Sequence, residues 1–136
     1  MGSTTDKYRV WKPPQELPLL NFVSLTDDRD GFRVVTTPYQ AEYVITSHIT
    51  FHFKSVYAYR NIDESHRIGT QALLREQGVD SSNLYIVEPS SWLEWFFEEK
   101  LIDLPWLKHF AIYTADDYID VITPSEPTIT VSNPPS

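Results

Sequence analysis

His48 and His52 stand four residues apart in the segment "SHITFHF". On a helix this spacing would place two imidazoles side by side as ligands for a metal ion. The surrounding residues alternate between apolar and polar types, however, and this period of two predicts a strand. On a strand the two rings lie roughly 13 Å apart along one face. We therefore expect no metal site here, and we interpret both histidines as residues of a polar strand face.

Three acidic residues near the C-terminus, Asp116, Asp117 and Asp120, form a second candidate for chemistry. Two neighbouring carboxylates can act as acid and base when burial separates their pKa values. Asp116 and Asp117 fall in a short loop between two strand patterns, where turn formation explains them. Asp120 alternates with Ile119 and Val121, so it should lie on the opposite face of its strand from these two residues.

Other signatures of catalysis and cofactor binding are missing from the sequence. The four glycines form neither a phosphate-binding loop nor a dinucleotide turn, and the sequence has no cysteine nucleophile, disulfide or thiolate metal site. The segment "DDRDG", residues 27–31, lacks the two key carboxylates of a calcium loop. His109 opens an apolar strand and is interpreted as a structural histidine. We therefore expect no metal and no cofactor, and we favour a protein that is not an enzyme.

The protein is strongly acidic, and its charge is unevenly distributed along the sequence. The net charge is −8, and the acidic excess lies in residues 76–136, which hold eleven acidic and two basic residues. This balance argues against binding to nucleic acid or to an anionic membrane, because both require basic patches. The acidic region is either a solvated face that maintains solubility or a surface for a basic partner.

The segment "SSWLEWFFEEK", residues 90–100, concentrates four aromatic rings in the acidic region. Ser91 and Glu94 fit a capping box, which predicts a helix from about Trp92 to Leu101. Its apolar residues span an arc of roughly 200°, about twice what a surface helix needs to face its core. We expect most of the rings to be core, with Trp92 or Phe97 as the exposed rings if a surface remains. The candidate partner-binding residues are Trp92, Glu94, Phe97, Glu98, Glu99, Asp116 and Asp117.

The elements that position these residues predict an α+β fold with a mainly antiparallel sheet of about five strands and two helices packed on one face. Strand patterns occur at 32–37, 83–87, 109–114 and 118–123, and within 43–59, which must bend or split near Ser47. We expect a single domain, 1–136, in which an irregular N-terminal segment, 1–21, packs on a globular core, 22–123. The proline-rich segment 124–136 is expected to be an extended or mobile tail.

Three functional hypotheses remain. The favoured hypothesis is a non-enzymatic acidic protein-binding domain, for which an immunity or inhibitor protein that neutralises a basic partner would fit. The alternatives are a small-molecule-binding or hydrolytic domain, with a pocket between the aromatic helix and the sheet lined by His48, His52 or His109, and a structural homodimer joined through a strand edge. No signal peptide pattern and no run of about 20 apolar residues is found, so a cytoplasmic location is expected.

Overall fold

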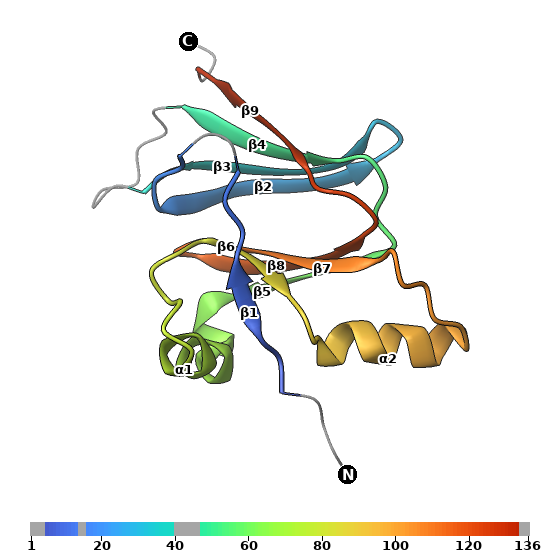
Figure 1. Cartoon of the computed structure of the whole chain (residues 1–136). Coiled ribbons are helices and arrows are strands. Elements are labelled where there is room, and N and C mark those ends of the chain that lie inside the picture. Colours follow the sequence, from blue (N-terminus) through green and yellow to red (C-terminus); the bar gives the residue numbers. More distant parts are fainter. Residues whose placement is uncertain (1–4, 14–15, 40–46, 134–136) are drawn as a thin grey trace.

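The computed structural model describes residues 5–13, 16–39 and 47–133, which fold into three layers (Figure 1). Two antiparallel sheets pack face to face, and both helices lie on the outer face of one of them. The predicted α+β class, with two helices on one face of an antiparallel sheet of five strands, is confirmed. The second sheet was not part of that prediction.

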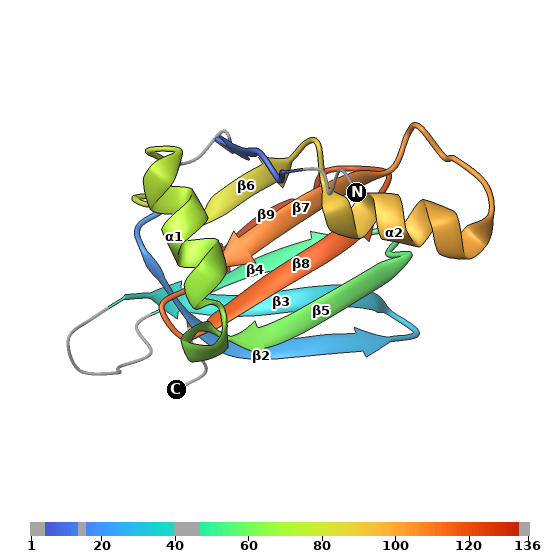
Figure 2. The ribbon, with the colours of Figure 1, turned by 90° about the horizontal axis from the view of Figure 1, so that it is seen from below.

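The sheet that carries the helices, called here the helix-bearing sheet, has the strand order β1-β6-β7-β8-β5. Its strands are β1 (Tyr8–Val10), β5 (Ala58–Asp63), β6 (Leu84–Val87), β7 (Lys108–Tyr113) and β8 (Asp117–Thr123). The four-stranded sheet has the order β2-β3-β4-β9, with β2 (Leu20–Asp28), β3 (Gly31–Pro38), β4 (His48–Phe53) and β9 (Thr128–Ser132). A short 3₁₀ helix, η1 (Glu64–His66), precedes α1 (Ile68–Glu76), and α2 (Ser91–Lys100) follows β6. Figure 2 shows α1 and α2 over opposite ends of the helix-bearing sheet.

The four-stranded sheet depends on two strands that have weak sequence signals. In β2 the pairing with β3 shifts between Phe22 and Ser24, and this irregularity breaks the apolar alternation. Strand β9 lies within 124–136, where Pro124 and Pro127 precede the strand and so leave its ladder donors intact. The N-terminal segment likewise contains a strand, because β1 pairs with β6.

The long alternating segment 43–59 contributes to two strands in different sheets. Residues 40–46 lie outside the described residues, and the described part separates into β4 and β5. A bend or split near Ser47 stays a prediction, because it borders residues 40–46. In the described part, the chain leaves β4 after Phe53 and enters β5 at Ala58. Residues 54–57 carry the chain from the four-stranded sheet to the helix-bearing sheet, and this crossing divides the long alternating segment.

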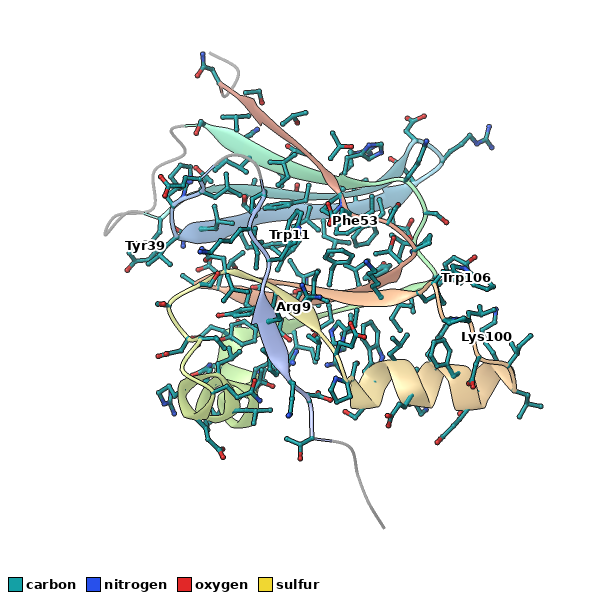
Figure 3. All side chains as sticks on the ribbon, viewed as in Figure 1. Arg9, Trp11, Tyr39, Phe53, Lys100 and Trp106 are labelled. Atoms are coloured by element: carbon teal, nitrogen blue, oxygen red, sulfur yellow. The ribbon has the colours of Figure 1, made fainter. Side chains whose placement is uncertain are left out.

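The main core lies between the two sheets. It includes the buried residues Leu20, Phe32, Val34, Phe51, Phe53, Phe110, Ile119 and Val121. Figure 3 shows Trp11 and Phe53 within this layer, where Trp11 meets Phe110 edge-on at 5.6 Å. A smaller core of Tyr8, Leu74, Tyr85, Val87 and Tyr113 joins α1 to the helix-bearing sheet. Because β8 directs Ile119 and Val121 into the main core, Asp120 lies on the helix side, as its alternation predicts.

The hairpin between β2 and β3 provides a test of backbone geometry. Gly31 has φ +118°, and a Cβ at this position would lie 2.5 Å from Nε2 of His52. The change Gly31→Ala should lower the free energy of unfolding by about 1–2 kcal/mol, because side chains disfavour this backbone region. The control Gly69→Ala, in α1, meets no described atom within 4 Å. It should raise stability by about 0.5–1 kcal/mol. Chemical denaturation measures both, and effects of the same sign would contradict this account.

Candidate functional site

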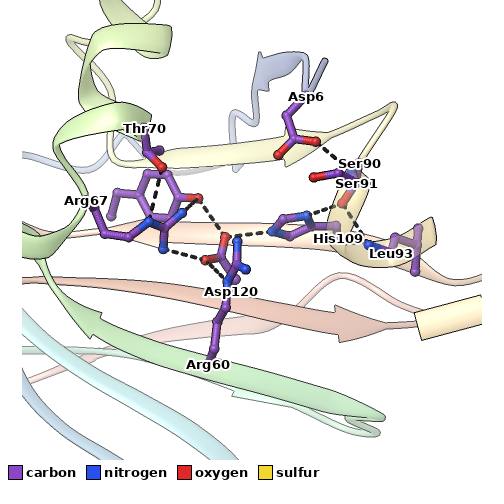
Figure 4. Close-up of polar contacts among 10 residues, drawn as sticks. Asp6, Arg60, Arg67, Thr70, Ser90, Ser91, Leu93, His109 and Asp120 are labelled. Atoms are coloured by element: carbon purple, nitrogen blue, oxygen red, sulfur yellow. Dashed lines mark hydrogen bonds and ion pairs between the residues drawn. The ribbon is translucent and has the colours of Figure 1, made fainter. Parts of the chain in front are cut away.

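A buried cluster of charged side chains lies on the outer face of the helix-bearing sheet (Figure 4). At its centre is Asp120, which is fully buried. Its Oδ1 accepts a hydrogen bond from the Tyr113 hydroxyl at 2.6 Å and lies 2.6 Å from Nε2 of His109. Its Oδ2 accepts from Nε of Arg60 at 2.8 Å and from Nη1 of Arg67 at 3.0 Å. Four side chains therefore surround one carboxylate.

Strand register explains most of this arrangement. Asp120 of β8 lies opposite Ala111 on one side and opposite Arg60 on the other. His109 and Tyr113 are two residues before and after Ala111 on β7, so both lie on the same face as the carboxylate. The arginine that register does not place is Arg67, which stands between η1 and α1 and reaches down to the sheet.

The electrostatics of the cluster favour an ionised carboxylate. Burial acts to raise the pKa of Asp120, but the hydrogen bond and charge from His109, together with the charges of Arg60 and Arg67, hold that pKa well below its ordinary value. Burial acts to lower the pKa of Arg67, but the charge of Asp120, the Tyr113 side chain and the hydrogen bonds to both together raise that pKa above its ordinary value. Burial and the nearby carboxylate also raise the pKa of Tyr113 well above its usual range. Asp120 and Arg67 thus form a charged pair that is removed from water.

The cluster is connected to α2 through Ser90. Its Oγ accepts a hydrogen bond from the Leu93 amide at 3.1 Å and lies 2.7 Å from Nδ1 of His109. The N-cap is thus Ser90, and the predicted capping box on Ser91 is wrong by one residue, because the Ser90 hydroxyl bonds the N3 amide. Nε2–H of His109 is placed to donate to the Asp120 carboxylate, while Nδ1 of the same ring shares the other hydrogen bond with the Ser90 hydroxyl.

Ser90, His109 and Asp120 are the residue types of a nucleophilic hydrolase triad. Their environment differs from that of an active site. His109 and Asp120 are fully buried, Ser90 is almost so, and the Ser90 oxygen already accepts the helix-capping bond. A reacting group must be able to approach its nucleophile. The arrangement instead ties the start of α2 to the sheet, so we assign it a structural role.

The central position of Asp120 makes its removal costly. Asp120→Asn leaves Arg67 buried without its counter-charge and replaces an acceptor by a donor that faces arginine donors. We expect the free energy of unfolding to fall by about 3–5 kcal/mol. Asp30→Asn, at an exposed turn position, should change it by less than about 0.5 kcal/mol. Urea denaturation measures both, and equal stabilities would show that the cluster does not support the fold.

The depressed pKa of Asp120 also predicts a pH dependence. Above its unfolded value of about 4, the ionised carboxylate stabilises the folded state. As the pH falls below about 4, the unfolded chain binds the proton first, so the stability advantage of the native protein over Asp120→Asn should shrink. Denaturation of both proteins between neutral and acid pH measures this difference. An advantage that stays constant or grows at low pH would contradict the prediction.

Apolar side chains of α2 and the following turn form a separate, exposed surface. All ten residues of α2 are described and none of them is buried, so the expectation of a mostly buried aromatic helix is wrong. The physical reason is visible in Figures 1 and 2, where the C-terminal half of α2 extends past the ends of the strands. The exposed ring is Trp95, which is 50% exposed, rather than Trp92 or Phe97. Trp92 is held edge-on to His109 at 5.0 Å, with the Arg60 guanidinium 4.6 Å above its ring.

The candidate partner-binding residues separate into two groups. Those of α2 come together around an open groove of about 520 Å³, which is lined by Glu94, Phe97, Glu98, Leu101, Ile102 and Asp103. Glu99 is also exposed on α2. Asp116 and Asp117 lie far from them, at the turn between β7 and β8 near α1 (Figure 2). Asp116 accepts hydrogen bonds from the Asn21 side chain and the Phe22 amide, so it links the two sheets.

The three histidines proposed for an alternative pocket are not brought together. His48 and His52 lie on β4, in the four-stranded sheet, whereas His109 lies on the helix side of the other sheet. A cavity of about 200 Å³ between α2 and the helix-bearing sheet is lined by His109, with Leu93, Phe97 and Leu107. It is smaller than the roughly 300 Å³ at which ligand pockets usually begin.

Among the described residues, no group of three or more His, Cys, Asp or Glu side chains is placed to hold a metal ion. Within the same ranges, no helix combines the length and apolar character needed to cross a bilayer. Comparison with known proteins found no family model, curated protein or solved structure that matches the chain.

Proposed function

We propose that this protein is a non-catalytic protein-binding domain that docks a basic partner protein on the end of α2. The binding surface, called here the α2 face, consists of Glu94, Phe97, Glu98, Leu101, Ile102 and Asp103, the residues that line the 520 Å³ groove. The single observation that carries the proposal is the strained and exposed conformation of Leu101. This leucine has a left-handed backbone, with φ 59°, and its side chain is 91% exposed.

Leu101 is energetically unfavourable in the isolated domain for two reasons. It occupies the helix-terminal position where glycine is preferred, and a left-handed backbone costs a residue with a Cβ about 1–2 kcal/mol. Its exposed side chain recovers no energy from burial. Backbone strain of this kind typically persists where a site needs the side chain. Since the C-terminal half of α2 extends past the ends of the strands, we infer that a partner covers Leu101.

The surroundings of Leu101 indicate the chemistry of that partner. Ile102 is 54% exposed and Phe97 is half-buried, so they offer an apolar floor. Glu98 and Asp103 place carboxylates along the same groove. An apolar floor bordered by acids suits apolar side chains flanked by lysine or arginine, because complementary charge steers association and apolar anchors hold the complex.

Lys100, the residue before Leu101, places its ammonium against rings outside this groove. The Lys100 ammonium lies 5.6 Å from the Tyr57 ring centre and 5.7 Å from that of Phe96, and neither ring lines the groove. In a neutralising role, the acidic α2 face would cover a basic surface on which the activity of the partner depends. The cytoplasmic location expected from the sequence is part of the same proposal.

The strain at Leu101 makes stability and binding respond in opposite directions. Leu101→Gly should raise the free energy of unfolding by about 1 kcal/mol, because it relieves the left-handed backbone. The same change should weaken partner binding at least about tenfold, since it removes a central apolar anchor. Thermal denaturation and titration calorimetry measure the two effects. A variant that gains stability and keeps full affinity would overturn the role of Leu101.

The binding experiment uses a displayed library of random peptides, selected on the native protein. Selected peptides should combine lysine or arginine with apolar residues, and their affinity should fall with added salt. Ile102→Asp should abolish binding, whereas the matched control Ile68→Asp, at an isoleucine of α1 that is 68% exposed, should not. Selection of acidic peptides, or equal loss in both variants, would refute the proposal.

A further inference from the structure

A pocket of about 460 Å³ lies beside α1, at one end of the helix-bearing sheet. Its walls include residues of η1 and α1, of the segment that leads into β6, and of the turn between β7 and β8. The volume falls within the range of roughly 300–1,000 Å³ that small-molecule sites usually have. Because α2 lies over the opposite end of the same sheet (Figure 2), this pocket is separate from the α2 face and does not depend on the proposed function.

Two stacked tyrosine rings contribute to the wall of the pocket. Tyr113 of β7 and Tyr118 of β8 lie opposite each other in the sheet, and their ring centres are 4.1 Å apart with an angle of 4° between the ring planes. Tyr113 is buried and donates its hydroxyl hydrogen bond to Asp120, so the buried charge cluster holds the stack in place. Tyr118 is only half-buried. A fixed aromatic surface of this kind favours a ligand that contains a planar ring.

Charged side chains of both signs line the same pocket. Glu64 belongs to η1, Arg75 to the last turn of α1, and Asp80 to the segment that follows. Across the described residues, Arg75 and Asp80 form no ion pair, so both remain available to a charged ligand. Burial and the Glu64 carboxylate raise the pKa of Tyr118, whereas nearby arginines, Arg75 among them, act to lower it. Glu64 and Arg75 therefore both lie near the stacked rings.

Gln71 holds the acidic group of the pocket in position. Its Nε2 donates to Oε2 of Glu64 at 3.0 Å and to the main-chain oxygen of the same residue at 2.7 Å. Gln71 and Arg75 are four residues apart on α1, so they lie on the same side of the helix. The helix thus presents an arginine and an anchored carboxylate to one pocket, and groups that are fixed in advance lose less entropy when a ligand binds.

We propose that this pocket binds a small zwitterion with a planar ring, of the class of the aromatic α-amino acids. The ring of the ligand lies against the tyrosine stack, its carboxylate meets the Arg75 guanidinium, and its ammonium meets the Glu64 carboxylate. Each charge of the ligand then has a partner of opposite sign, and such charge-assisted hydrogen bonds are the strong ones. A nucleotide or another purely anionic ligand would face the carboxylates of Glu64 and Asp80, which disfavour it.

The first measurement compares three probes by titration calorimetry of the full chain. L-Phenylalanine carries the ring and both charges, 2-phenylethylamine lacks the carboxylate, and 3-phenylpropionate lacks the ammonium. L-Phenylalanine should bind about tenfold more tightly than either analogue, because each analogue leaves one charged group of the pocket without a partner. In nuclear magnetic resonance spectra it should shift the amide signals of α1 and of the β7–β8 turn, and not those of α2. Absence of L-phenylalanine binding, or equal affinity for the three probes, would overturn the proposal.

Neutral variants separate the two ends of the ligand. Arg75→Gln should weaken L-phenylalanine binding about tenfold without weakening that of 2-phenylethylamine, which has no carboxylate for the arginine to meet. Glu64→Gln should weaken L-phenylalanine binding without weakening that of 3-phenylpropionate, which has no ammonium. The matched control Glu76→Gln changes an exposed neighbour of Arg75 on α1 that does not line the pocket, and it should keep full affinity for each probe. Circular dichroism verifies that each variant is folded. An equal loss for all three probes in Arg75→Gln, or the same loss in Glu76→Gln, would refute the assignment.

Discussion

The ionised carboxylate of Asp120 is the constraint on which the helix layer depends. A buried charge is tolerated only when its surroundings compensate it, and here the compensating groups come from three separate parts of the chain. Arg60 is supplied by β5, His109 and Tyr113 by β7, and Arg67 by the approach to α1. Through Ser90, the same network fixes the start of α2. One side chain therefore sets where both helices attach, while the apolar layer between the sheets is assembled without it.

This dependence also explains how far the sequence could be interpreted. Alternation correctly placed Asp120 on the strand face opposite Ile119 and Val121, and the regular patterns of β3, β6, β7 and β8 were predicted correctly. The partners of the carboxylate were not, because Arg67 reaches it across 53 residues and no local pattern encodes that contact. The N-cap was missed by one residue, because Ser90 and Ser91 are adjacent serines. Only the fold shows that the Ser90 hydroxyl contacts both the Leu93 amide and His109.

The exposed helix surface was missed for a different reason. The number of rings in α2 suggested a core, but whether rings are buried depends on how far the sheet extends beneath them. The sheet ends before α2 does (Figure 1), and Leu101 and Ile102, which follow the helix, are exposed. In the same way, β9 lay in a proline-rich segment whose composition concealed a strand. In both cases the outcome depended on how far the sheet extends and where the segment lies in the fold, and local sequence specifies neither.

The order in which the chain visits the two sheets has a consequence for how the protein folds. The chain passes from β1 to β2, from β4 to β5, and from β8 to β9, and each passage carries it from one sheet to the other. The β2–β3, β3–β4 and β7–β8 pairs are close in sequence, whereas Tyr8 must find Val87, and His52 must find Thr128. Such non-local pairing requires large loops to close before any contact rewards them, which is typical of slowly folding β-rich domains. During synthesis, β4 is complete long before β9 emerges to cover it, so the four-stranded sheet can be finished only when almost the whole chain is available.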